Sequence, residues 1–166
     1  TRTKGLNVLC PYPEGPRSFR TASTSLCVIG LLTSPLKEDP AVKASLDKAL
    51  QYLLTTLPTL KRGDTRTVLG VWGHAYGLSA LSRAARNLPA DAPLREELKK
   101  VASLQVKALD QMADVQGGWG YYTFETFSKR PIGEPTSFLT ATVLLAYKDA
   151  EQAFGLKAEP VSYTHL

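Results

Sequence analysis

The chain has 166 residues, of which 43% are hydrophobic and 21% charged, and its formal net charge is +5. This length and composition fit one globular domain with a real core, and no apolar run approaches the ~18 residues that span a membrane. Lys and Arg are scattered without a basic block interleaved with aromatics, which argues against a nucleic-acid partner. Cys10 and Cys27 are too few for a disulfide framework or a zinc site, and a single bridge between them and the cellular compartment stay open.

The first part of the chain predicts an irregular segment followed by two helices. Residues 1–20 hold Pro11, Pro13, Gly15 and Pro16, which favours a loop. A helix is then expected over 21–32, buried on all sides because its residues are small or apolar. An amphipathic helix is expected over 40–57, with Asp39 as its N-cap and Pro40 at its first position.

The second part predicts three further helices. The helix over 67–87 carries apolar residues round most of its surface, and its three glycines suggest close backbone packing. Asp91 before Pro93 repeats the capping pattern, and the helix over 94–115 is amphipathic, with Asp114 on its solvent side. After a long loop over 117–135, an apolar helix over 136–154 ends at Gly155, and residues 156–166 form an irregular tail.

Two kinds of helix alternate along residues 21–155, and this alternation indicates an internal repeat. The pattern Lys48-Ala49-x-x-Tyr52-Leu53-x-x-x-Leu57 matches Lys107-Ala108-x-x-Gln111-Met112-x-x-x-Gln116 at an offset of 59 residues (107 − 48). Three apolar blocks, 24–31, 74–81 and 140–147, also superpose. We therefore expect a repeating unit that consists of an outer amphipathic helix, a loop and an inner buried helix. Its period of 59 residues does not fit tetratricopeptide repeats, whose period is ~34 residues.

The segment Gln116-Gly117-Gly118-Trp119-Gly120 resembles the Gln–Trp repeat of squalene cyclases and protein prenyltransferases. Together with Val71-Trp72-Gly73-His74-Ala75-Tyr76-Gly77 and the run 62–66, it is similar to prenyltransferase/squalene-oxidase-repeat proteins of the planctomycete type. The resemblance implies an all-α fold, an α/α toroid whose inner helices line a central cavity while outer helices face solvent. It also implies about half of a ring, with the remaining repeats of a longer protein as a partner.

The glycine and tryptophan motif has a structural interpretation and a functional one. Gly117 and Gly118 tolerate the positive φ that stops a helix, and Trp119 can pack beneath the loop and join consecutive helices. Alternatively, Trp119, Tyr121, Tyr122 and Phe124 form an aromatic rim for an apolar or cationic ligand.

The inner helix over 67–87 adds three candidates that could contact a ligand in the cavity: Trp72, His74 and Tyr76. His74 could move a proton there near neutral pH, or it could be a hydrogen-bonded histidine of the core.

The sequence lacks the catalytic and metal-binding motifs that enzymes with such folds use. No Asp-x-Asp acid run and no Cys/His/Asp zinc spacing occurs, nor a phosphate loop or a Gly-x-Ser-x-Gly elbow. We therefore predict no catalytic residue, metal or cofactor in this chain. The first hypothesis is a repeat domain that offers an apolar concave surface to a hydrophobic small molecule, a peptide or the rest of the protein. The alternative is half of an isoprenoid-handling class II cyclase or transferase whose catalytic site lies outside this sequence.

Overall fold

The structure, a computed structural model, describes residues 14–62, 68–123 and 130–158. Its described residues form five α-helices and one short 3-10 helix: α1 (Glu14–Thr33), α2 (Pro40–Thr56), η1 (Leu57–Thr59), α3 (Gly70–Arg86), α4 (Pro93–Met112) and α5 (Ser137–Phe154). None of these helices has both the length and the apolar composition that a membrane crossing requires. The predicted all-α class is confirmed.

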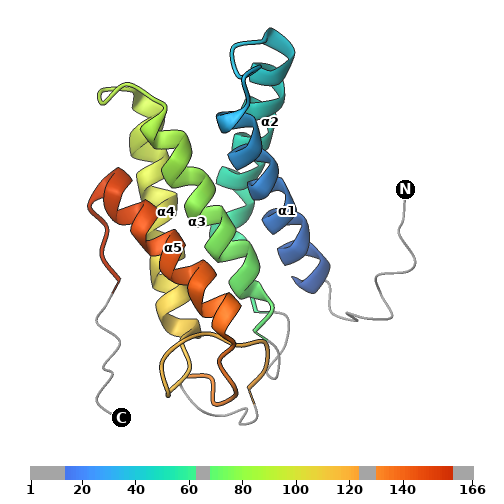
Figure 1. Cartoon of the computed structure of the whole chain (residues 1–166), viewed down its shortest axis with the longest axis vertical. Helices are drawn as coiled ribbons and strands as arrows, with labels where there is room; N and C mark the ends of the chain where they lie inside the picture. Colours follow the sequence, from blue (N-terminus) through green and yellow to red (C-terminus); the bar gives the residue numbers. More distant parts are fainter. Residues whose placement is uncertain (1–13, 63–67, 124–129, 159–166) are drawn as a thin grey trace.

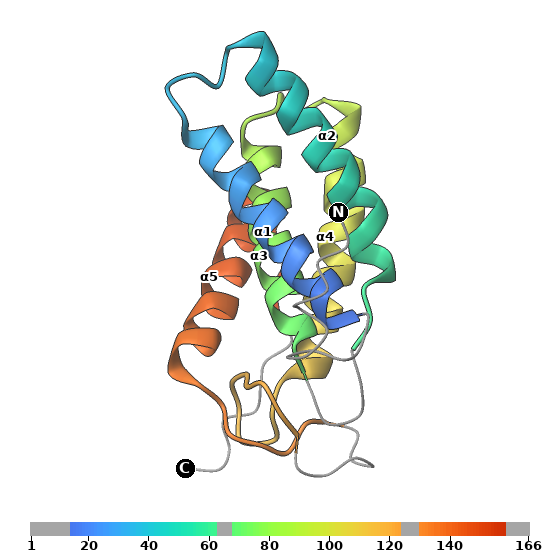
Figure 2. The ribbon, with the colours of Figure 1, turned by 90° about the vertical axis from the view of Figure 1, so that its right-hand side faces the viewer.

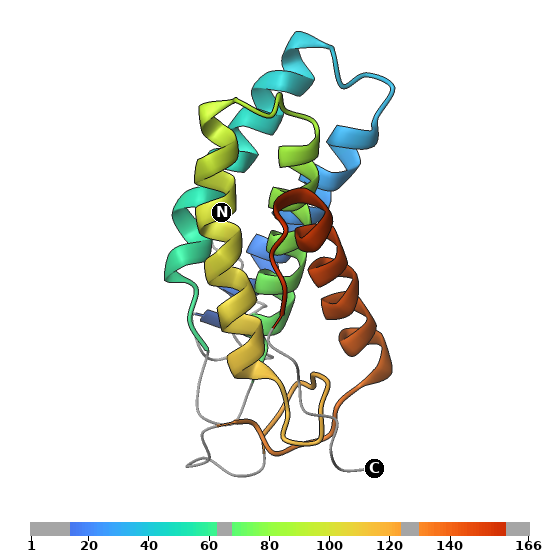
Figure 3. The same ribbon diagram turned by 90° about the vertical axis from the view of Figure 1, so that its left-hand side faces the viewer.

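The helices pack in two layers. α1, α3 and α5 run in the same direction, with α3 between the other two, while α2 and α4 run the opposite way (Figure 1). The two side views show α2 and α4 on one side, α5 on the other, and α1 and α3 between them (Figure 2 and Figure 3). The three segments with the buried pattern thus share one layer, and the two amphipathic segments share the second.

The central helix α3 is buried on nearly every side, as its apolar sequence predicts. Its glycines allow this close packing, because a Cβ added at Gly73 would lie 2.5 Å from Leu60 Cδ2, and one at Gly77 would lie 2.5 Å from Leu57 Cδ2. Both leucines belong to the segment that follows α2. At Gly73 a Cβ would also lie 3.2 Å from the backbone O of Ser18 on α1, so the predicted close backbone approach is confirmed there. At Gly77 the space is occupied by the Leu57 side chain and not by a neighbouring backbone.

Helix α1 differs from the prediction in two respects. It begins at Glu14 and not at residue 21, because Gly15 and Pro16 fall in its first turn, where proline needs no backbone donor. It is also not buried all round: Leu26, Cys27 and Gly30 are exposed. Because α1 stands at the edge of its layer, α2 and α3 cover only part of its surface.

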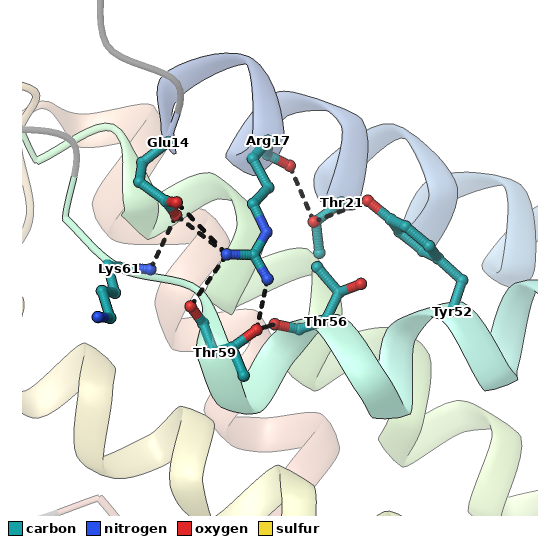
Figure 4. Close-up of polar contacts among 7 residues, drawn as sticks. All are labelled: Glu14, Arg17, Thr21, Tyr52, Thr56, Thr59 and Lys61. Atoms are coloured by element: carbon teal, nitrogen blue, oxygen red, sulfur yellow. Dashed lines mark hydrogen bonds and ion pairs between the residues drawn. The ribbon is translucent and has the colours of Figure 1, made fainter.

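A polar network joins the first turns of α1 to the end of α2 (Figure 4). Arg17 pairs with Glu14 at 3.4 Å and donates to the Thr59 carbonyl O at 3.1 Å and to the Thr59 hydroxyl. The Glu14 carboxylate also accepts from the Lys61 backbone N at 3.3 Å. Since residues 14–20 were predicted to be irregular, the sequence analysis missed this network.

The helix ends confirm some capping predictions and correct another. The Asp39 carboxylate caps α2 by accepting from the backbone N of Ala41 and Val42, and Gly155 ends α5 with a φ of 69°. The predicted cap at Asp91 is wrong, because the N-cap of α4 is Ala92 and no side chain in the described part of the chain bonds to the free N–H groups there. The signal in the sequence for the start of α4 is therefore Pro93, which lies in the first turn of the helix.

Candidate functional site

The loop between α4 and α5 is held in place by a buried aspartate. The Asp114 carboxylate accepts from the backbone N of Gln116 at 2.8 Å and from that of Gly133 at 2.7 Å, so one side chain joins both ends of the loop. The predicted solvent position of Asp114 is wrong, because α4 ends at Met112 and the chain turns inward. The Gln116 side chain is exposed, and only its backbone takes part in this turn.

The glycine and tryptophan motif supports the fold in the way the structural interpretation predicts. Gly117 and Gly118 adopt φ values of 83° and 94°, which L side chains rarely take. Trp119 is 1% exposed, and its indole N–H donates to the Leu109 carbonyl O at 2.8 Å. A Cβ at Gly120 would overlap the backbone carbonyl of Glu134. Trp119 therefore faces the core and not a ligand-accessible surface.

Trp119 also contacts a buried tyrosine of α5. The rings of Trp119 and Tyr147 meet edge to face at 5.8 Å, and the Tyr147 hydroxyl donates to Asp110 Oδ1 at 2.6 Å. Burial, together with the Asp110 carboxylate, raises the pKa of Tyr147 well above its ordinary value of 10.0. The phenol therefore stays a neutral donor, and this group of residues joins α4, α5 and the loop.

Five aromatic side chains from α3, α5 and the loop gather on the side of α3 that α4 does not cover. Trp72 stacks on Tyr76 at 5.5 Å between ring centroids and lies 6.0 Å from Phe138. Tyr121 lies 6.1 Å from Trp72, 5.9 Å from Phe138 and 6.3 Å from Tyr122. Among these, Tyr122 is 57% and Phe138 53% exposed. The structure brings together four of the predicted candidates and adds Phe138.

Exposed apolar residues also lie on α1 and α5, the two helices that flank α3. Phe19 and Leu26 lie seven residues apart (26 − 19), two turns along α1, and helical geometry places them away from the residues that contact α2. Leu145 is 62% exposed and shares a side of α5 with Phe138. We call the whole surface the aromatic face; its residues are Phe19, Leu26, Trp72, Tyr76, Tyr121, Tyr122, Phe138 and Leu145.

Two arginines stand at the other end of the same side of α3. Arg83 Nε and Arg86 Nη2 each donate to the Asp149 carboxylate at 2.9 Å, and Arg86 also donates to the Gln152 amide O at 2.6 Å. The Asp149 side chain is only 10% exposed, whereas the two arginine side chains are 39% and 37% exposed. The sequence analysis did not single out these residues, because their partner Asp149 lies 63 positions along the chain from Arg86.

His74 does not join the other predicted candidates. It points between the layers toward α4, where its Nδ1 lies 2.6 Å from the Gln105 amide O, and it is 3% exposed. Burial lowers the pKa of His74 despite the opposing hydrogen bond to Gln105, so the ring is neutral. The expected place of His74 beside the cavity is wrong, and the alternative of a core histidine describes it.

A small cavity opens beside the aromatic face. Tyr121, Tyr122, Glu134 and Thr136 line about 200 Å³ of space, below the usual range of ligand pockets. The hydroxyl of Thr136 is buried and has no hydrogen-bond partner among the described residues. Phe124, which the rim hypothesis includes, lies outside the described residues. The cavity by itself is too small for a ligand of ordinary size, so the face around it is the larger feature.

The described residues hold no group of three or more His, Cys, Asp or Glu side chains that could bind a metal ion. No protein-family model matches this chain, and the searches of curated proteins and of solved structures also found no match. The resemblance to prenyltransferase/squalene-oxidase-repeat proteins therefore stays a prediction from the motifs.

Proposed function

We propose that this chain is a non-catalytic helical-repeat domain of the α/α-toroid type, whose aromatic face binds a hydrophobic small molecule or an apolar peptide. One observation carries the proposal: Trp72, Tyr76, Tyr121, Tyr122 and Phe138 converge on one side of α3 and stay at least partly exposed. Trp119, by comparison, is buried in the core of the protein. The fold therefore does not bury these aromatic side chains completely, and a partner can cover them.

The energetic argument concerns the surface that these residues leave in water. Apolar surface gains roughly 25 cal/mol per Å² when it is buried, and an aromatic side chain carries 150–250 Å² in round numbers. Phe138, Tyr122 and Leu145 are each more than half exposed, so a partner that covers them gains several kcal/mol in all, on the order of one to two for each side chain. Contiguous apolar patches of this kind mark interaction sites.

The toroid part of the proposal is supported by the layers. The three inner segments of the predicted repeat, α1, α3 and α5, are neighbours that run in parallel, and α2 and α4 cover their back (Figure 1). In a ring of such units the aromatic face belongs to the layer that surrounds the centre. Beyond α5, a groove lined by Leu144, Tyr147 and Leu156 offers a place for the next helices of a longer protein.

Binding of a hydrophobic dye tests the proposal. 1-Anilinonaphthalene-8-sulfonate is titrated into the whole chain and into Phe138→Ser, Tyr122→Ser and the control Leu104→Ser, which changes an exposed leucine on α4. Each change on the face should weaken dye binding by about fivefold to tenfold, because ~1 kcal/mol of apolar contact is lost. The proposal fails if Leu104→Ser weakens binding and the other two variants bind as the unchanged chain does.

A further inference from the structure

Resting on the proposed function, we propose that the partner of the aromatic face is an acidic amphipathic helix. Its apolar side chains cover Trp72, Tyr76 and Phe138, and a carboxylate of the same helix binds Arg83. The aromatic face and the neighbouring Arg83 then form one protein-interaction surface, which recognises apolar side chains at one end and a carboxylate at the other.

The charge at the arginine end is not balanced within the described residues. Arg83 and Arg86 share the single carboxylate of Asp149, which leaves a net charge of +1 on the three side chains. Arg83 uses only Nε for this pair, and its two terminal nitrogens have no protein acceptor among the described residues. Since Asp149 is almost buried, it holds the guanidinium in place and leaves its outer edge ready for a second carboxylate.

The position of Arg83 relative to the aromatic residues sets the spacing. Trp72, Tyr76 and Arg83 fall on one stripe of α3, since steps of four and seven residues return to the same side of a helix. From Tyr76 to Arg83 the rise is about 10 Å, which is two helical turns. A partner helix along this stripe therefore needs an Asp or Glu about two turns from the apolar side chains that reach the aromatic end.

The shape and composition of the face favour a helix over a small molecule. α3 lies between α1 and α5, and the exposed apolar residues extend from Phe19 on α1 to Leu145 on α5, so the surface spans three helices (Figure 1). Helices pack at 8–10 Å between axes in general, and binding of an amphipathic helix to such a surface is a common mode of recognition. Trp, Tyr and Arg are also the residues enriched at interface hot spots.

Selection from a library of displayed peptides tests the inference. A library of single-helix peptides with randomised surface positions is selected for binding to the whole chain. The enriched peptides should carry apolar residues at i and i+3 or i+4, and an Asp or Glu about two turns away. In one enriched peptide made synthetically, replacing that Glu with Gln should weaken binding about tenfold, the ordinary loss for one charged hydrogen-bonded pair.

The protein variants then locate the charge. Arg83→Gln should bind the Glu and Gln forms of the peptide equally, whereas the control Arg20→Gln, an exposed arginine on α1, should keep the tenfold difference. The peptide comparison needs no protein variant, so it remains decisive if Arg83→Gln unfolds.

The remaining outcomes separate this inference from the function on which it rests. Enriched peptides without an acidic preference, or no enriched peptides from a chain that still binds the dye, overturn the acidic helix and leave the hydrophobic face standing. Peptides whose binding is unchanged in Phe138→Ser count against both proposals.

Discussion

Replacing Trp119 with Phe separates the two contributions of this residue to stability. The phenyl ring keeps most of the apolar burial, but the indole N–H that donates to the Leu109 carbonyl O at 2.8 Å is lost. That carbonyl belongs to the last turn of α4, where the helix no longer supplies a partner for every oxygen. Leaving one buried group unpaired costs about 1–3 kcal/mol, and the smaller ring adds a cavity cost of about 1 kcal/mol.

The assay is urea unfolding followed by circular dichroism. We expect Trp119→Phe to lose about 2–4 kcal/mol of unfolding free energy. The control Tyr122→Phe changes a residue that is 57% exposed and should stay within about 0.5 kcal/mol. If Trp119→Phe were as stable as the unchanged chain, Trp119 would not be the residue that joins the loop to α4, and the structural interpretation of the motif would be refuted.

Three further changes test other parts of the structure. The folded state lowers the pKa of His74 below its ordinary 6.5, so the unfolded chain takes up the proton at a higher pH than the folded chain does. The stability that depends on neutral His74 is therefore present above pH 6.5 and is lost as the pH falls below it. In thermal unfolding, His74→Gln should remove this part of the pH dependence. Gly120→Ala should cost about 2 kcal/mol, since its Cβ meets the Glu134 carbonyl, whereas Gly30→Ala, with open space around it, should be neutral or stabilising in the same urea assay. Arg17→Ala should cost about 1 kcal/mol by breaking the link from α1 to Thr59, and Arg20→Ala, which this network does not include, should show a smaller loss.

Local patterns predicted the helices and the role of the motif. The alternation of wholly apolar and amphipathic segments separated α1, α3 and α5 from α2 and α4 because a helix covered on one side needs only one apolar stripe. Gly117, Gly118 and Trp119 were interpreted correctly since their conformations and burial follow from adjacent residues.

The positions that depend on distant partners were not predictable in the same way. Asp114 is buried because Gly133, on the far side of the loop, donates to it, and no short spacing reveals such a contact. Phe138 was missed as a site residue because α5 is apolar on most sides, so the sequence does not show which side a neighbour leaves open. The error on His74 was avoidable: it is two residues from both Trp72 and Tyr76, which puts it on the opposite side of α3.

The two tryptophans provide the most direct test of the aromatic face. In a ¹⁵N-labelled sample each indole N–H gives its own signal, one from Trp72 on the face and one from Trp119 in the core. When 1-anilinonaphthalene-8-sulfonate is added, the Trp72 signal should shift progressively, while that of Trp119, bonded to Leu109, should stay in place. A shift of the Trp119 signal, or of the α4 amides around Leu104, with Trp72 unmoved would contradict the assignment of the aromatic face as the binding surface.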